Sequence, residues 1–187
     1  MRKGIVSTLG IIVLFGIAWW GGVAIGNLLS KPDQADQESG RKEITASFLN
    51  QTDAIATGGR WPDIPLQSLD GSWIRLSDVI NDTLLLIVIQ PGCEACEQEL
   101  DSLNELLSSD QASLHILLIS DAYPLDLVKL RDERAIKSLI LVDRNRDIFR
   151  LFDLMVFPLN VTIAPSMTIV GITVGILTED EVRKNFK

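Results

Sequence analysis

The sequence predicts an α/β fold, a mixed β-sheet flanked by helices, with one additional apolar helix at the N-terminus. Apolar runs typical of buried strands alternate with helical patterns over residues 61–187, and this alternation indicates a sheet covered by helices. The last two apolar runs, residues 157–165 and 168–177, follow each other closely and predict a hairpin. An uncharged stretch over residues 4–30 stands apart from this pattern.

The N-terminal stretch is long enough to be a membrane anchor. A helix of that length, at about 1.5 Å per residue, spans a hydrocarbon core of about 30 Å. A cleaved secretory signal is the alternative, but its apolar core is usually about 7 to 15 residues long and ends at a small-residue cleavage site. Arg2 and Lys3 precede the stretch and acidic residues follow it. We therefore expect a single span with the N-terminus in the cytoplasm and the rest of the chain on the extracytoplasmic side.

The chain divides into an anchor at residues 1–30, a linker at 31–60 and a globular domain at 61–187. The linker contains the run KPDQADQESGRKE, which is poor in apolar residues and typical of a tether. The net charge is -8, and no cluster of Lys and Arg occurs. A nucleic-acid-binding surface requires such a cluster, so no nucleic-acid partner is expected.

Each element of the domain follows from its local pattern. Two short strands flank the Asp70–Gly71 turn, and Ser77 is placed to cap a short helix. The apolar run 83–90 predicts a strand buried on both faces, and leucines at helical spacing predict a helix over 93–109. The remaining expected elements are a strand at 113–121, a helix at 124–137, a strand at 138–143, a helix at 146–154, the hairpin, and a closing helix at 179–186.

The stretch QPGCEAC, residues 90–96, holds both cysteines of the chain at the junction of a strand and a helix. At a helix N-terminus, unpaired N–H groups and the helix dipole favour a thiolate. We therefore expect Cys93 to be the exposed nucleophile and Cys96 the more buried cysteine that resolves the mixed disulfide. The disulfide of this pair is the redox-active group, and no other cofactor is expected. A structural staple is the weakest interpretation, because a bridge over so short a loop stabilises little.

These features resemble the membrane-anchored thioredoxin-like family of bacteria that includes the TlpA and ResA thiol-disulfide oxidoreductases. The resemblance runs from about Pro65 to Phe186 and is carried by LDGSWIRLSDV, LLLIVIQPGCEACEQEL, LVDRNRDIFRLFDL and VFPLNVTIAPSMTIVG. It implies that Pro158 is a cis-proline facing the cysteine pair, and that Phe157 lends backbone groups to an extended substrate. An ordinary turn or edge-strand proline is the alternative for Pro158.

The resemblance also bears on Glu99, which lies three residues after Cys96 and thus on the same helix face. In cytochrome c maturation members of the family, a glutamate at this place is implicated in the thiol chemistry. Glu99 is therefore the candidate to handle the Cys96 proton, although a first-turn glutamate is also common helix chemistry. Thioredoxin's buried acid falls on the strand instead, at the position of Ile87.

Departures from the family pattern concern the substrate groove. Gly92 stands where most members have a tryptophan, which looks like the variant that assists methylamine dehydrogenase maturation. Phe157 and Leu159 replace the usual residues on either side of the cis-proline. We therefore expect Gly92, Phe157 and Pro158 to shape a substrate groove that is more apolar than usual.

The expected function is a thiol-disulfide oxidoreductase anchored in a bacterial cytoplasmic membrane, with its catalytic domain on the extracytoplasmic side. Glu94, Glu97 and Glu99 oppose the helix dipole and disfavour the Cys93 thiolate, which favours a reductant over an oxidant. The implied partners are client proteins with disulfides, as in cytochrome c biogenesis or the maturation of another enzyme, and a transmembrane thiol electron donor.

Two other functions remain open from the sequence. The first is a thioredoxin-fold interaction protein that matures one client, in which the CxxC is vestigial or secondary. The second is copper(I) delivery by the two cysteines together with His115 or a methionine. His115 is the only histidine, and its place in an expected strand is more typical of a core or strand-end residue.

Overall fold

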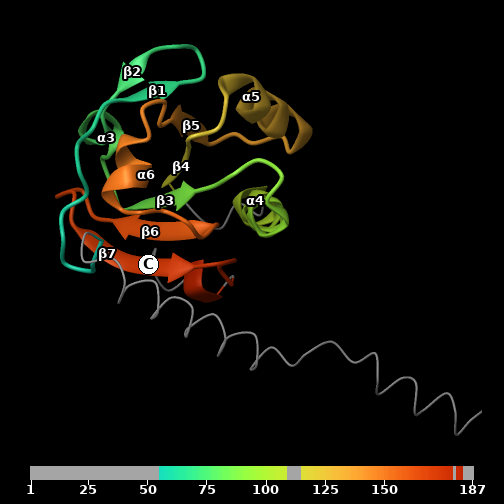
Figure 1. Cartoon of the computed structure of the whole chain (residues 1–187). Coiled ribbons are helices and arrows are strands. Elements are labelled where there is room, and N and C mark those ends of the chain that lie inside the picture. The colour runs from blue at the N-terminus through green and yellow to red at the C-terminus, as the bar shows by residue number, and fades with distance from the viewer. Residues whose placement is uncertain (1–54, 109–114, 179, 183–187) are drawn as a thin grey trace, which may run out of the picture. The chain divides into compact units, whose positions relative to one another are not determined.

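Residues 55–108, 115–178 and 180–182 are described by the computed structural model, and within them the fold is a seven-stranded mixed sheet (Figure 1). The strand order is β2-β1-β5-β4-β3-β6-β7. Strands β3, β4 and β5 are parallel, whereas β1 and β6 pair antiparallel with β5 and β3. The predicted α/β class with a mixed sheet is confirmed. The strands are β1 (Leu66–Ser68), β2 (Trp73–Ile74), β3 (Leu84–Val88), β4 (His115–Ser120), β5 (Leu139–Val142), β6 (Leu159–Ile163) and β7 (Ile169–Val174).

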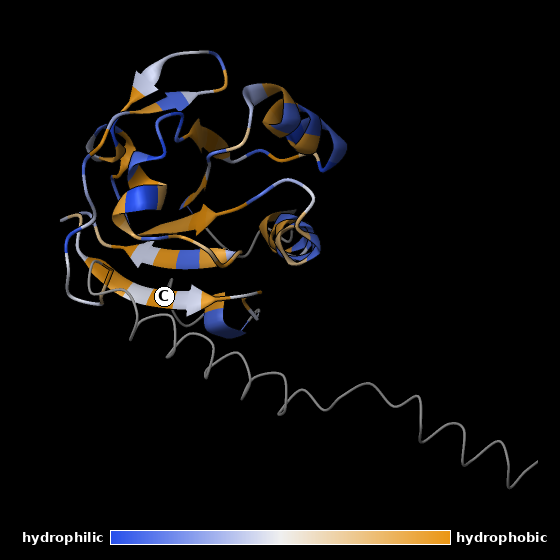
Figure 2. Cartoon of the chain, viewed as in Figure 1, coloured by the Kyte–Doolittle hydropathy of each residue, from blue (hydrophilic) through white to orange (hydrophobic). Residues whose placement is uncertain are grey.

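Helices cover both faces of the sheet, and β3 supplies a core to each face. Leu86 and the β3 residues that point to the same face pack with the side chains of α3 (Leu76–Val79) and α6 (Asp147–Leu151). Leu85 and Ile87 pack instead with α4 (Glu94–Ser108) and α5 (Pro124–Glu133). In Figure 2, β3 is apolar along its whole length, whereas α4 carries both apolar and polar residues. The continuous apolar run is therefore the sequence of a strand with helices on both sides.

Residues before the predicted domain boundary also belong to the packed domain. Ile55 is fully buried and Trp61 is 1% exposed, and both lie in the core on the α3 and α6 side. The Gly58 N–H donates to the Ile169 carbonyl at 2.8 Å, and the Ile169 N–H donates to the Gly59 carbonyl at 2.9 Å, at the start of β7. Residues 55–60, which the sequence assigned to the linker, thus pack with the domain.

The predicted anchor at residues 1–30 lies outside the described residues, as does most of the linker. Among the residues that are described, no helix is both long and apolar enough to cross a membrane. Residues 180–182 are helical, and the rest of the predicted closing helix lies outside the described part of the chain.

Two predicted helix boundaries are wrong in detail. Ser77 does not cap α3, because Arg75 occupies the N-cap position and its N–H donates to Asp78 at 3.1 Å. The Ser77 hydroxyl instead donates to Asp63 at 2.8 Å. Helix α5 ends at Glu133, before the predicted end, because the chain turns at Ala135, where φ is 50° and the backbone is left-handed.

Candidate active site

A tight turn places the first cysteine at the start of α4. The Cys93 N–H donates to the Gln90 carbonyl at 3.2 Å, and Gly92 between them has a φ of 76°. A proline followed by a residue with positive φ is the pattern of a type II turn, in which glycine is favoured at the second central position. Pro91 and Gly92 therefore have a structural reason to occur together here.

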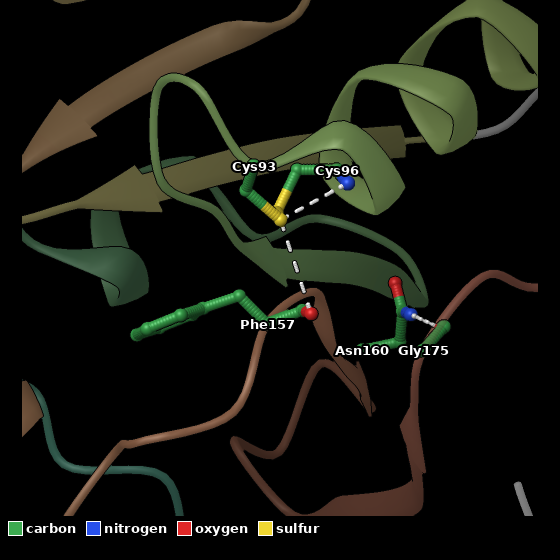
Figure 3. Close-up of a disulfide and its surroundings, with 5 residues drawn as sticks. All are labelled: Cys93, Cys96, Phe157, Asn160 and Gly175. Atoms are coloured by element: carbon green, nitrogen blue, oxygen red, sulfur yellow. Dashed lines mark hydrogen bonds between the residues drawn. A yellow bond between two sulfur atoms is a disulfide. The ribbon is translucent and has the colours of Figure 1, made fainter.

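Cys93 is the N-cap residue of α4, and its sulfur accepts a hydrogen bond from the helix. The Cys93 carbonyl accepts from the Glu97 N–H at 3.0 Å, and the Cys96 N–H donates to the Cys93 Sγ at 3.2 Å (Figure 3). Cys93 and Cys96 form a disulfide, with Cα atoms 5.2 Å apart. Cys93 is half-buried and Cys96 is fully buried. This difference in access suits the predicted roles of attacking and resolving cysteine.

The loop before β6 brings a backbone carbonyl to the disulfide. The Phe157–Pro158 peptide bond is cis, as the family resemblance implies. The Phe157 carbonyl oxygen lies 3.9 Å from the Cys93 Sγ, whereas the Phe157 ring extends away from the two sulfur atoms (Figure 3). The ring packs on Phe149 with centroids 5.8 Å apart. Phe157 thus presents backbone atoms to Cys93, and its partly buried ring packs against the core. Its expected contribution to an apolar substrate groove stays a prediction.

Glu99 is buried behind the disulfide. Its side chain is 1% exposed, and its Oε1 accepts from the Leu177 N–H at 3.1 Å. Cys96 and Glu99 are one turn apart on the buried face of α4, where residues i and i+3 are neighbours. The position suits a group that exchanges a proton with Cys96, and that role stays a prediction.

An arginine offsets part of the negative charge on α4. Arg134 forms ion pairs with Glu97 and Asp101. Glu94 is exposed and forms no ion pair with a residue that the structure describes, and its Oε1 accepts from Gln98 at 3.2 Å. Of the glutamates expected to disfavour the Cys93 thiolate, Glu97 therefore has its charge offset by Arg134, whereas Glu94 has no such partner among the described residues.

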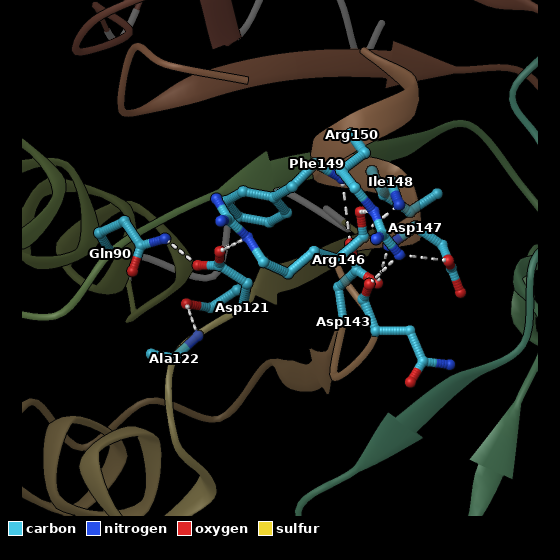
Figure 4. A network of polar contacts seen from close by, with 11 residues as sticks. Gln90, Asp121, Ala122, Asp143, Arg146, Asp147, Ile148, Phe149 and Arg150 are labelled. Atoms are coloured by element: carbon cyan, nitrogen blue, oxygen red, sulfur yellow. Dashed lines mark hydrogen bonds and ion pairs between the residues drawn. The ribbon is translucent and has the colours of Figure 1, made fainter. Parts of the chain in front are cut away.

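A polar network connects the turn before Cys93 with α6, and sequence reasoning missed it (Figure 4). Asp121, at the end of β4, accepts a hydrogen bond from Gln90 and forms an ion pair with the Arg146 Nε at 2.7 Å. The Arg146 guanidinium lies 5.9 Å from the centroid of the Phe149 ring, which in turn packs on Phe157. Contacts therefore run from the base of the cysteine turn to the residue before the cis-proline.

Asp143 holds the start of α6 beneath this network. It is 1% exposed, and its carboxylate accepts from the N–H groups of Asp147, Ile148 and Phe149 at 2.8, 2.9 and 3.0 Å. Burial raises the pKa of the Asp143 carboxyl above its ordinary value, and these three donors oppose that rise. The carboxylate thereby fixes the helix that carries Phe149.

Replacing Asp143 by alanine should destabilise the protein by about 2 to 3 kcal/mol, because it leaves buried N–H groups without an acceptor. The pKa of Asp143 is higher in the folded protein than in the unfolded chain, so protonation of Asp143 favours the folded state. This contribution to stability is fully present below the pKa of the unfolded chain, and it is lost as pH rises through the pKa of the folded protein. The stability difference between the two proteins, measured by urea unfolding, should therefore be larger at pH 4 than at pH 7. A difference that grows with pH would contradict this. Asp126→Ala, which removes an exposed carboxylate from the first turn of α5, is the control.

His115 lies far from the cysteine pair. It is exposed at the start of β4, where it pairs with Leu84 at the start of the parallel strand β3. Cys93 follows the opposite end of β3. His115 therefore cannot complete a copper site with the two cysteines. Of the two placements that the sequence favoured, core or strand end, it has the second, and it is exposed because only the later part of β4 is covered.

Comparison with known proteins identifies the family. Residues 57–173 match the AhpC/TSA family. The chain is 25% identical over 146 residues to the thiol-disulfide oxidoreductase ResA of Geobacillus thermodenitrificans, which covers 77% of this chain and 84% of that protein. Two solved structures are similar in fold. The thioredoxin domain of a thiol-disulfide oxidoreductase from Bacteroides vulgatus has a TM-score of 0.60 at 22% identity, covering 71% of this chain and 99% of that one. StoA from Bacillus subtilis has a TM-score of 0.55 at 11% identity, covering 66% and 98%.

The fold, the position of the cysteine pair and these similarities agree with one another. The chain belongs to the AhpC/TSA family, and it is a thiol-disulfide oxidoreductase of thioredoxin-like fold.

Proposed function

We propose that this oxidoreductase reduces disulfides in client proteins on the extracytoplasmic side of a bacterial cytoplasmic membrane. The observation that carries the chemistry is the placement of the half-buried Cys93 at the N-terminus of α4 and against the Phe157 carbonyl. The uncharged stretch over residues 4–30 supports an anchor in the membrane. Clients in cytochrome c biogenesis, or another enzyme under maturation, are proposed from the family resemblance.

The reaction begins with Cys93. Its thiolate, which the Cys96 N–H favours, attacks one sulfur of the client disulfide. The client S–S bond breaks, a mixed disulfide with Cys93 forms, and the other client sulfur leaves as a thiolate and takes up a proton. The backbone of Phe157 lies beside the Cys93 sulfur and can pair with an extended client segment.

Cys96 completes the transfer. Its thiol gives its proton to Glu99, and the resulting thiolate attacks the Cys93 sulfur. The mixed disulfide breaks, the second client sulfur leaves and takes the proton, and the Cys93–Cys96 disulfide forms. Two electrons pass from enzyme to client, which gains two protons. A transmembrane thiol carrier is the proposed donor that reduces the enzyme again.

The direction of electron flow is supported by Glu94, whose exposed carboxylate begins α4 beside Cys93. A negative charge there disfavours the thiolate, which makes the dithiol a better reductant. The hydrogen bond from Cys96 N–H acts in the opposite direction. The reduction potential reports the net result of these two effects.

The test is the reduction potential of the full chain in detergent, by equilibration with glutathione or dithiothreitol and counting of trapped thiols. We expect a value below about −220 mV, in the range of thioredoxin-type reductants. A value above about −150 mV would identify an oxidant and overturn the proposed direction. A pair that does not cycle at all would instead support an interaction protein in which the CxxC is secondary.

A further inference from the structure

A buried amide lies on β6, two residues beyond the cis-proline. Asn160 is 2% exposed, and its Nδ2 donates to the Gly175 carbonyl at 2.9 Å. Because a carbonyl oxygen can only accept, the nitrogen must face Gly175 and the Oδ1 must point to the other side. In Figure 3 that side is the one that faces the Cys93–Cys96 pair. The Oδ1 accepts no hydrogen bond from any residue that the structure describes.

The strand register places Asn160 on the same side of the sheet as Cys96. Asn160 pairs with Ile87 across β3 and β6, so the two side chains share one face of the sheet. Ile87 and Cys96 belong to the same buried cluster, beneath α4. Ile87 is also the position at which thioredoxin carries its buried acid, so the polar group on this face comes from the neighbouring strand instead.

Asn160 and Glu99 also hold the same segment of chain. Asn160 binds the Gly175 carbonyl and Glu99 binds the Leu177 N–H, two residues further on. Glu99 in turn lies one helical turn from Cys96. The amide, the carboxyl group and the resolving cysteine therefore line one buried region behind the disulfide.

A buried amide oxygen without a donor is unfavourable, because it has lost its hydrogen bonds to water without replacement. In the disulfide form, Cys96 carries no hydrogen and cannot donate. Reduction of the disulfide by two electrons and two protons breaks the S–S bond and gives each sulfur an S–H group. Cys96 then becomes a donor in a region where an acceptor is already present.

From this we propose that Asn160 is a positioning residue for Cys96, whose Oδ1 accepts a hydrogen bond from the Cys96 S–H in the reduced enzyme only. The unpaired oxygen destabilises the disulfide form, and its pairing stabilises the dithiol. Asn160 thereby raises the reduction potential. The inference rests on the thiol-disulfide chemistry of the proposed function, but neither on its direction nor on its client.

The potential of an Asn160→Leu variant tests the thermodynamic consequence. Leucine has the same number of side-chain heavy atoms, branched at the same carbon, and no acceptor, so the disulfide form should be favoured by about tenfold and the potential should fall by about 30 mV. Thr162→Val is the matched control, because Thr162 is 5% exposed, lies on the same face of β6 and pairs with Leu85, further from the disulfide. Its potential should stay unchanged. An unchanged or raised potential in Asn160→Leu would overturn the proposal.

Infrared spectroscopy of a Cys93→Ser variant tests the hydrogen bond itself. Cys96 is then the only thiol of the chain, so one S–H stretching band reports its environment. The band should lie at the lower wavenumber of a hydrogen-bonded thiol, and Asn160→Leu in this background should shift it upward. If the double variant does not fold, the single variant suffices, because a band at the wavenumber of a free thiol contradicts the proposal. This variant cannot turn over, so the result is independent of the proposed client reduction.

Discussion

Replacing Cys96 by serine should abolish turnover and leave a client covalently attached to Cys93. The first attack requires only the half-buried Cys93, which keeps its place at the start of α4. The second attack requires a thiolate at position 96, and the hydroxyl of a serine cannot take its place as the nucleophile. The measurement is single-turnover reaction with a disulfide peptide, followed by mass spectrometry of the intact chain. A mass increase equal to half of the peptide disulfide is the expected result.

Cys93→Ser is the matched control for this experiment. It retains the buried Cys96, and because Cys96 is 0% exposed, no adduct should form on the same timescale. Equal adduct formation in both variants would contradict the assignment of Cys93 as the attacking residue. Turnover by Cys96→Ser would contradict the role of Cys96, because thiols in solution would then be resolving the mixed disulfide without it.

Replacing Glu99 by glutamine should slow the second step by about a hundredfold and leave the first step unchanged. A positioned proton acceptor contributes about a hundredfold or more to a rate, and an amide cannot take the Cys96 proton. Glutamine has nearly the same shape and keeps an oxygen that can accept from the Leu177 N–H, so the fold should be preserved. Stopped-flow release of the second client thiol measures the affected step. The first step is measured separately in the Cys96→Ser background.

Glu97→Gln is the control for Glu99. It removes a carboxylate from the same helix, but that carboxylate is ion-paired with Arg134 and partly exposed. The second step should therefore change by less than about twofold, in line with the small effects of surface ion pairs. If Glu99→Gln also remained within this range, Glu99 would be a structural anchor of the segment after β7 and not a proton acceptor.

Local features of this protein were predictable because their causes lie close together in the sequence. The apolar run before QPGCEAC has the length of a strand, and its continuous apolar pattern is typical of a strand covered on both faces. Strand β3 is buried at every position. Cys93 and Cys96 are three residues apart, so the start of a helix at this point is sufficient to bring them together. The cis bond before Pro158 came from the family resemblance and not from any local pattern.

The charges around the site were the least predictable part. Arg134 neutralises Glu97 across 37 residues, and this pairing depends on how α4 and the end of α5 pack on the sheet. Asp121 and Arg146 form an ion pair because β4 and the turn before α6 end at the same edge of the sheet. Asn160 is a polar residue in the mostly apolar run VFPLNVTI, but the sequence did not show what its side chain faces.

The sequence by itself determined the main elements, their order and the closeness of the two cysteines, because periodicity and short spacing carry this information. The thiol-disulfide chemistry of the pair was the favoured expectation, to which the family resemblance also contributed. Only the tertiary structure decided which groups surround the pair. Glu99 meets Leu177 across 78 residues, and Cys93 meets Phe157 across 64. Asn160 reaches the side of Cys96 only in the observed register of β6 on β3, since a slip of one residue would turn it to the opposite face.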